Sequence, residues 1–230
     1  MAAAFKMAIK YKEANGMTPQ FLIEPKPREP TKHQYDYDAQ TTIAFLKTYG
    51  LDKDFKLNIE PNHTTLAGHD FEHDIMIAAQ YGMLGSVDSN TGDPLLGWDT
   101  DQFPMDVKKA TLVMGAIIDM GGLGSGGLNF DCKVRRESTD DVDLFIGHIG
   151  AMDTFARGLR NAAKIREVGT LPDMVKARYS SFDGDGSFGK KIEEGLVSLE
   201  DCEAYIAKHG EPVQRSAQQE LYEMVLNRFV

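Results

Sequence analysis

Four short apolar runs, each carrying an acidic residue at or near its end, alternate with helical patterns along the first 136 residues. The acids are Glu24, Glu60, Asp88 and Asp131, and the runs are "QFLIEP", "FKLNIE", "LGSVDSN" and "GLNFDCKV". Between them lie "AQTTIAFLKTYG", "HDFEHDIMIAAQYG" and "DVKKATLVMGAIIDM", whose apolar residues recur at helical spacing. Strand and helix in alternation are typical of parallel βαβ units. The sequence therefore predicts an α/β fold with about four parallel βα units.

After Arg136 the strand pattern stops and helical patterns follow, the longest being "DVDLFIGHIGAMDTFARGLRNAAKIREVG". We therefore expect two parts. Residues 1–136 would form a partial (β/α) barrel that carries the functional site, and residues 137–230 a helical arm.

Charge and cysteine content narrow the classes of function. The chain has 35 acidic and 25 basic residues, a net charge of −10, which argues against nucleic acid as a partner. We see no apolar run long enough to span a bilayer and no signal-peptide pattern, so we expect no membrane association. Cys132 and Cys202 lie far apart between ordinary residues, which indicates reduced thiols. The sequence predicts a cytoplasmic protein.

The acids at the strand ends favour a metal site. Carboxyl ends of parallel strands meet at one edge of a sheet, and unpaired carboxylates gathered there repel one another. A divalent cation would compensate this charge, although helix caps and surface acids remain the other interpretation. Asp99 and Asp101 in "GWDTDQFP" would project to the same side of an extended chain, and His63 follows Glu60 closely. Many oxygen ligands with a single imidazole suit Mg²⁺, Mn²⁺ or Co²⁺.

Two further histidines, His69 and His73, stand four residues apart on either side of Glu72. The spacing would allow them to bind a metal on a helix, but the order is not HExxH. We therefore predict that they form the polar face of a helix.

Four long blocks now carry a resemblance to a known family: "FLIEPKPREPTKHQYDYD", "NIEPNHTTLAGHDFEHD", "SVDSNTGDPLLGWDTDQFP" and "GLNFDCKVRR". In this order they resemble xylose isomerase of the longer, class II type. The resemblance implies a TIM barrel followed by a helical arm that embraces a neighbouring subunit, usually in a tetramer. It also implies interconversion of D-xylose and D-xylulose, often also of D-glucose and D-fructose, by a hydride shift that uses two divalent cations.

The resemblance assigns roles residue by residue. The first, sugar-orienting cation would be bound by Glu24, Glu60, Asp88 and Asp131. The second would share Glu60 and be completed by His63, Asp99 and Asp101. Lys26 matches the catalytic lysine that contacts the carbonyl oxygen of the sugar. His69 and His73 receive no role.

The blocks match only the later half of the family's barrel. We therefore expect a truncated form that keeps both metal sites, with weak or absent activity when isolated. Four strands cannot close an eight-stranded barrel, so the exposed sheet edges and residues 137–230 would favour a homodimer or larger homo-oligomer. Two other functions stay open: a non-catalytic metal-binding or assembly module, and another metal-dependent barrel enzyme such as a phosphoesterase.

Overall fold

A parallel sheet of four strands organises the N-terminal part of the protein. The computed structural model describes residues 1–214 and 216–230, which form two compact units, Met1–Ala163 and Lys164–Val230. The strand order in space follows the order along the chain. The strands are β1 (Phe21–Ile23), β2 (Phe55–Ile59), β3 (Leu84–Asp88) and β4 (Leu128–Asn129). The predicted α/β fold with four parallel βα units is confirmed.

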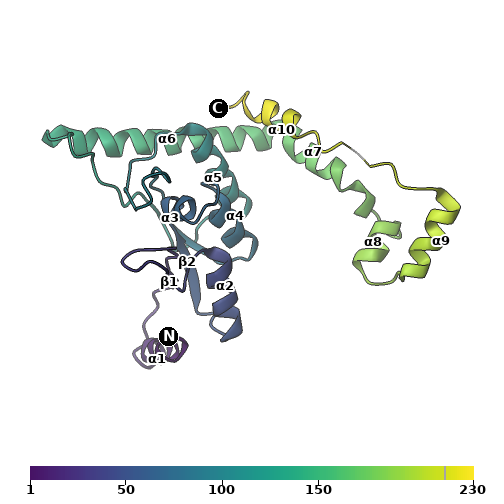
Figure 1. Cartoon of the computed structure of the whole chain (residues 1–230), viewed down its shortest axis with the longest axis horizontal. Coiled ribbons are helices and arrows are strands. Elements are labelled where there is room, and N and C mark those ends of the chain that lie inside the picture. The colour runs from purple at the N-terminus through teal and green to yellow at the C-terminus, as the bar shows by residue number, and fades with distance from the viewer. Residues whose placement is uncertain (215) are drawn as a thin grey trace. The chain divides into compact units, whose positions relative to one another are not determined.

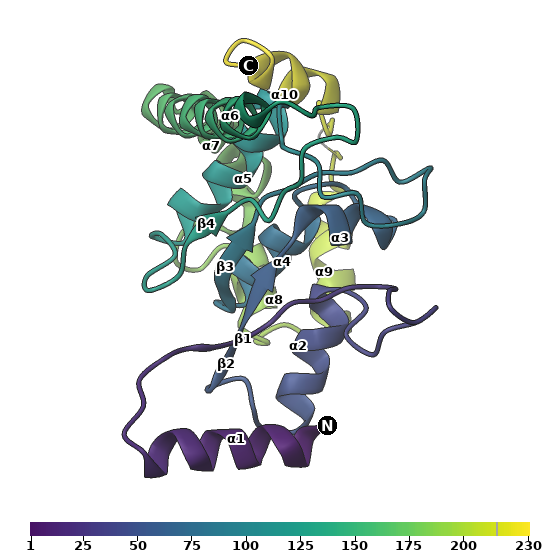
Figure 2. The same ribbon diagram turned by 90° about the vertical axis from the view of Figure 1, so that its left-hand side faces the viewer.

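Helices connect the strands and pack against them (Figures 1 and 2). They are α2 (Ala39–Thr48), α3 (Pro61–Leu66), α4 (His73–Gln80) and α5 (Val107–Asp119). Helix α4 contacts both α2 and α5, and it also contacts strands β2 and β3. The main core lies between these helices and the sheet, where Leu57, Ile75, Leu84, Val87 and Val113 are fully buried. Burial of such side chains is the main stabilising term in a fold of this kind.

Strand β2 shows why the sheet has two different faces. Phe55, Leu57 and Ile59 are buried, whereas the intervening Lys56 and Asn58 are partly exposed. Because side chains alternate across a strand, Asn58 lies on the face opposite to the buried apolar residues. This second face leads into the acidic end of the sheet.

The helix boundaries follow from local capping. Asp38 accepts a hydrogen bond from the backbone N–H of Thr41 at the start of α2, and Asp106 accepts two at the start of α5. Helix α3 begins with Pro61, a residue preferred at the first helical position.

Strand β4 is shorter than the run "GLNFDCKV" predicted. Only Leu128 and Asn129 pair with β3, opposite Val87 and Asp88. Asp131, two residues further on, has a φ of 44°, in the left-handed region, so the chain leaves the extended conformation before that acid.

The remaining helices are α1 (Ala2–Ala14), α6 (Asp141–Val168), α7 (Thr170–Arg178), α8 (Phe188–Glu193), α9 (Leu199–His209) and α10 (Gln219–Leu226), with the short 3₁₀ helix η1 (Ser180–Phe182). On α6, Gly158 lies against the backbone of Ala110 in α5, where an added Cβ would meet the Ala110 carbonyl carbon at 2.7 Å. In the C-terminal unit α10 contacts α7, and η1 contacts both α7 and α8. The helical C-terminal region is confirmed, whereas the division at residue 136 and the association role of residues 137–230 stay predictions.

None of the helices among the described residues is both long and apolar enough to cross a membrane. Cys132 and Cys202 are both free cysteines in the structure.

Candidate metal centre

Acidic residues gather at the carboxyl ends of the four strands, and this position follows from the parallel topology. Glu24 directly follows β1, Glu60 directly follows β2 and Asp88 ends β3. Asp131 lies just beyond β4. Parallel strands in sequential order therefore bring together acids that are far apart along the chain.

Glu60 is the common member of the groups that these residues form. It is buried, with 2% of its surface exposed, and ligand atoms within each group lie within 4.8 Å of one another. The groups are Glu24, Glu60 and His63; Glu60, Asp99 and Asp101; and Glu60, Asp88 and Asp131. Every residue that the resemblance assigned to a metal therefore lies in one cluster, around the residue predicted to bridge two ions.

His63, in the first turns of α3, is oriented by a backbone carbonyl. Its Nδ1 lies 3.0 Å from the carbonyl oxygen of Pro25, and its Nε2 lies 3.0 Å from Asp99 Oδ2 and 3.1 Å from Glu60 Oε1. Donation of the Nδ1 proton to Pro25 would leave the Nε2 lone pair available to a metal ion bound between the two carboxylates. Metal-binding histidines commonly have a carbonyl partner of this kind on the other ring nitrogen.

Several buried oxygens in the cluster accept no hydrogen bond, which supports the metal interpretation. They are Glu60 Oε1, Asn58 Oδ1 and Asn90 Oδ1. A buried acceptor without a partner is costly in free energy, and a divalent cation would satisfy it. The donors present, mostly carboxylate oxygens with one imidazole, fit a hard divalent ion.

Protonation in the cluster is strongly perturbed. Burial raises the pKa of Glu60 well above its ordinary value, and the negative charge of Asp99 adds to this effect. Burial also opposes ionisation of Asp99, but hydrogen bonds with His63, Asp101 and Lys26 outweigh it and hold the pKa of Asp99 low. Burial and the neighbouring Asp99 raise the pKa of Asp101. Without a cation, the cluster therefore does not hold all of its carboxylates ionised at neutral pH.

Two lysines partly neutralise the cluster. Lys26 Nζ donates to Asp99 Oδ2 at 2.8 Å and lies 3.4 Å from Glu29 Oε2. Lys133 donates to Asp101 Oδ2. Lys26, the predicted catalytic lysine, is therefore in contact with one of the predicted metal ligands.

Asp101 and Asp131 have left-handed backbone conformations, with φ values of 45° and 44°. Such conformations are uncommon for residues other than glycine and cost free energy. Two of the predicted ligands therefore have an unfavourable backbone conformation, which is a common feature of functional sites.

Three asparagines contribute to the cluster and were missed by the sequence analysis. Asn58 Nδ2 donates to both Glu24 Oε2, at 2.8 Å, and Asp88 Oδ2, at 2.6 Å. Asn62 donates to Asp99, and Asn90 Nδ2 donates to the carbonyl oxygen of Asp131 at 2.9 Å. The period of two along β2 was an available signal for Asn58, because it puts Asn58 on the same side of the strand as Glu60.

The prediction that His69 and His73 form one polar helix face is wrong. Helix α4 begins at His73, whereas His69 lies in the turn that separates α3 from α4. Gly68, with a φ of 91°, ends the helical course before His69.

The fold and the cluster define a class, namely an α/β protein of the TIM-barrel type with a carboxylate-rich centre at the carboxyl ends of its strands. A solved structure titled as L-ribulose 3-epimerase has the same fold in part. Its TM-score is 0.52 at 19% identity, over 74% of this chain and 56% of that chain.

The sequence comparisons are more specific. Xylose isomerases of Phocaeicola vulgatus and Enterococcus faecalis are 54% and 53% identical to this chain over its whole length, which covers 52% of each relative. Xylose isomerase of Arabidopsis thaliana is 54% identical over 98% of this chain and 47% of its own length. A family model described as the XylA2 C-terminal domain matches residues 175–230. The similarity to xylose isomerase predicted from the sequence blocks is confirmed, and the chain spans about half the length of these relatives.

Proposed function

We propose that this chain carries the two-metal centre of an aldose–ketose isomerase that interconverts D-xylose and D-xylulose. The observation that supports it best is the convergence of all the predicted ligands around the buried Glu60. Xylose isomerases that match the whole chain support the same reaction. Because the chain spans about half of those proteins, its activity in isolation is expected to be weak or absent.

The ligands divide between two ions of Mg²⁺, Mn²⁺ or Co²⁺. Glu24, Glu60, Asp88 and Asp131 would hold the first, and Glu60, His63, Asp99 and Asp101 the second. Glu60 would be shared because each of the three ligand groups in the acidic cluster contains it. Asn58 supports the ligands of the first ion, because its amide group donates one hydrogen bond to Glu24 and one to Asp88.

The divalent ions would supply Lewis acidity toward the oxygens of an open-chain sugar. Side chains of the protein would position the substrate and the ions. Lys26 lies beside Asp99 at the rim of the cluster and has 24% of its side chain exposed, so its ammonium group can donate a hydrogen bond to a sugar oxygen and stabilise negative charge there. His63 stays fixed in orientation through Pro25 while its Nε2 serves as the only imidazole ligand.

We also propose that residues 137–230 mediate association of copies of the chain into a homo-oligomer and that the protein is cytoplasmic. Apolar side chains are exposed along α6, among them Phe145, Ile146, Ile149 and Met152. Contiguous apolar surface of this kind commonly marks an association site. Light scattering over a dilution series tests this proposal, and a monomer at every micromolar concentration contradicts it.

Calorimetric titration with Mn²⁺ tests the proposed centre. We expect two ions per chain, and we expect Glu60→Ala to abolish binding of both, because it removes the shared ligand. Thermal unfolding should show a higher Tm with Mn²⁺ for the unaltered chain only, since the ion binds the folded state. Absence of Mn²⁺ binding, or binding that is unchanged in Glu60→Ala, contradicts the two-metal centre.

Turnover assays distinguish the proposed isomerase from the two alternatives, a non-catalytic metal-binding or assembly module and a metal-dependent phosphoesterase. Conversion of D-xylose with Mg²⁺ or Mn²⁺, even at a low rate, supports the isomerase. Metal binding without turnover of xylose supports the non-catalytic module, and hydrolysis of a phosphoester substrate supports the phosphoesterase.

A further inference from the structure

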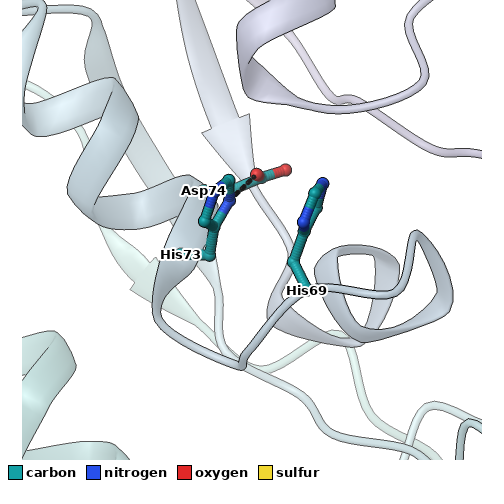
Figure 3. A group of neighbouring side chains, drawn as sticks. All are labelled: His69, His73 and Asp74. Carbon is teal, nitrogen blue, oxygen red and sulfur yellow. Dashed lines mark hydrogen bonds and ion pairs between the residues drawn. The ribbon is translucent and has the colours of Figure 1, made fainter.

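Two histidines and two aspartates form a cluster that shares no residue with the acidic centre. His69 stacks on His73, with ring centroids 4.1 Å apart and ring planes inclined by 13° (Figure 3). Asp74 Oδ1 lies 2.9 Å from His73 Nδ1, and Asp38 Oδ2 lies 3.1 Å from His69 Nε2. Each imidazole therefore has its own carboxylate partner.

The two carboxylates are buried and held by backbone amides. Asp74 Oδ2 accepts from the N–H of Ala39 at 3.1 Å, and Asp38 Oδ1 accepts from the N–H of Thr41 at 2.8 Å. The carboxylates are thus fixed by α2, whereas the imidazoles keep 28% and 30% of their side-chain surface exposed. Both imidazole rings are therefore partly accessible from solvent, whereas the carboxylates that contact them are held in position.

The spacing of the donor atoms is close to that of a coordination sphere. One nitrogen of each ring and one oxygen of Asp74 all lie within 4.8 Å of one another. Zinc–nitrogen bonds are about 2.0–2.1 Å, so ligand atoms on one tetrahedral zinc are roughly 3.3 Å apart. Rotation of the two partly exposed rings out of their parallel stack would direct one nitrogen of each toward the same ion. We propose that His69, His73 and Asp74 bind one imidazole-preferring divalent ion such as Zn²⁺, at a site separate from the acidic centre.

The ligand types distinguish this site from the acidic centre. Two imidazoles with a carboxylate favour Zn²⁺, Ni²⁺ or Cu²⁺ over Mg²⁺, whereas the acidic centre offers many oxygens and a single imidazole, His63. Asp38 orients the ring of His69 by its hydrogen bond, as carboxylates beside metal-binding histidines commonly do.

A bound ion would connect three segments that lie close together in the fold. His69 belongs to the turn after α3, His73 and Asp74 begin α4, and both aspartates are bonded to the first turn of α2. The ion would therefore stabilise the start of α2 and the turn before α4, and it would raise the Tm of the folded chain.

Zinc titration of the full chain in saturating Mg²⁺ tests the proposal. We expect His73→Gln to bind one Zn²⁺ fewer per chain than the unaltered protein, or to bind that ion at least about 10-fold more weakly. His69→Cys should keep the ion, because a thiolate also binds zinc. His209→Gln, at an exposed position on α9 outside any group of nearby ligands in the described residues, is the matched control and should bind Zn²⁺ unchanged.

Electron paramagnetic resonance of Cu²⁺ bound to the unaltered chain gives a second reading that does not depend on a variant. Hyperfine structure from two imidazole nitrogens supports the site, because the acidic centre supplies one imidazole only. A titration in which no two-nitrogen signal develops at any Cu²⁺ loading up to saturation overturns it, as does a zinc stoichiometry and affinity unchanged in His73→Gln. These outcomes are independent of Mn²⁺ binding at Glu60, so this site and the proposed isomerase centre can fail separately.

Discussion

Lys26 Nζ lies 2.8 Å from Asp99 Oδ2, although 73 residues separate the two along the chain. The ammonium group of Lys26 therefore forms a hydrogen bond with an oxygen of Asp99, a residue that is proposed to bind the second cation. Asp99 also faces His63 Nε2 at 3.0 Å, so the carboxylate has both a lysine and an imidazole as partners. A divalent ion at the proposed second site would compete with Lys26 for Asp99, and the displaced lysine would be free to contact the proposed sugar substrate.

Removal of this competitor should strengthen metal binding. We expect Lys26→Gln to bind Mn²⁺ about three- to tenfold more tightly, because a nearby positive charge of this kind contributes on the order of 1 kcal/mol. Calorimetry with Mn²⁺ measures the effect. Lys47→Gln, which removes the surface ion pair with Asp52, is the matched control and should leave the affinity unchanged. Weaker binding in Lys26→Gln would show that the lysine supports the metal centre.

The raised pKa of Glu60 predicts how the metal-free chain responds to pH. A carboxyl whose pKa is higher in the folded than in the unfolded state binds its proton more tightly when folded. The free energy of unfolding therefore decreases as pH rises from the unfolded value, near 4.3, toward the folded one. The lowered pKa of Asp99 has the opposite effect, but only below its unfolded value of about 3.9.

Between pH 5 and 8 in the presence of a chelator, we therefore expect the Tm of the unaltered chain to fall. In Glu60→Gln the decrease should be much smaller, because the buried group no longer ionises. Calorimetric melts over this pH range measure the difference, with Glu13→Gln on the exposed side of α1 as the control. Parallel pH profiles for the unaltered chain and Glu60→Gln would contradict the role of Glu60 in this response.

Asn58 provides a test of the first set of ligands. Its amide donates to Glu24 and Asp88, so Asn58→Ala removes a hydrogen-bond donor that the two carboxylates share. We expect the affinity for Mn²⁺ at the first proposed site to fall about 10- to 100-fold. Losses of this size are usual when a residue that holds metal ligands in place is removed. Asn15→Ala, at an exposed position after α1, should have no effect. An unchanged Mn²⁺ titration for Asn58→Ala would mean that the carboxylates need no such support.

The parallel sheet and its acidic edge were predictable from the sequence because both depend on local patterns. Apolar runs of strand length, each with an acid at its end, alternate with helical patterns along the sequence. Because the strands of such a fold are parallel, their carboxyl ends and the acids there lie at one edge of the sheet. The supporting groups were not predictable in the same way. Asn62 and Asn90 act through contacts to Asp99 and to the backbone of Asp131, and these contacts exist only after the long loop before α5 has folded back.

The error at His69 and His73 has a local physical reason. A spacing of four residues predicts one helix face only if the helix is continuous, and Gly68 ends the helical course just before His69. The rings still meet, because the turn before α4 directs His69 back over the first residue of that helix. The same three-dimensional contact could not be deduced from the helical period.

The contact between α6 and α5 gives a prediction on stability, with a control in the same helix pair. A Cβ at Gly158 would meet the Ala110 carbonyl carbon at 2.7 Å and the Ala110 Cβ at 2.9 Å, so Gly158→Ala must push the two helices apart. Overpacking of this kind costs about 1–3 kcal/mol. Gly115, within α5, has nothing within 4 Å of an added Cβ. Gly115→Ala should therefore stabilise the chain by about 0.5–1 kcal/mol, because alanine loses less conformational entropy in a helix. Denaturant unfolding of both variants measures these opposite changes in the free energy of unfolding, and a Gly158→Ala variant as stable as Gly115→Ala would contradict the close approach of α6 to α5.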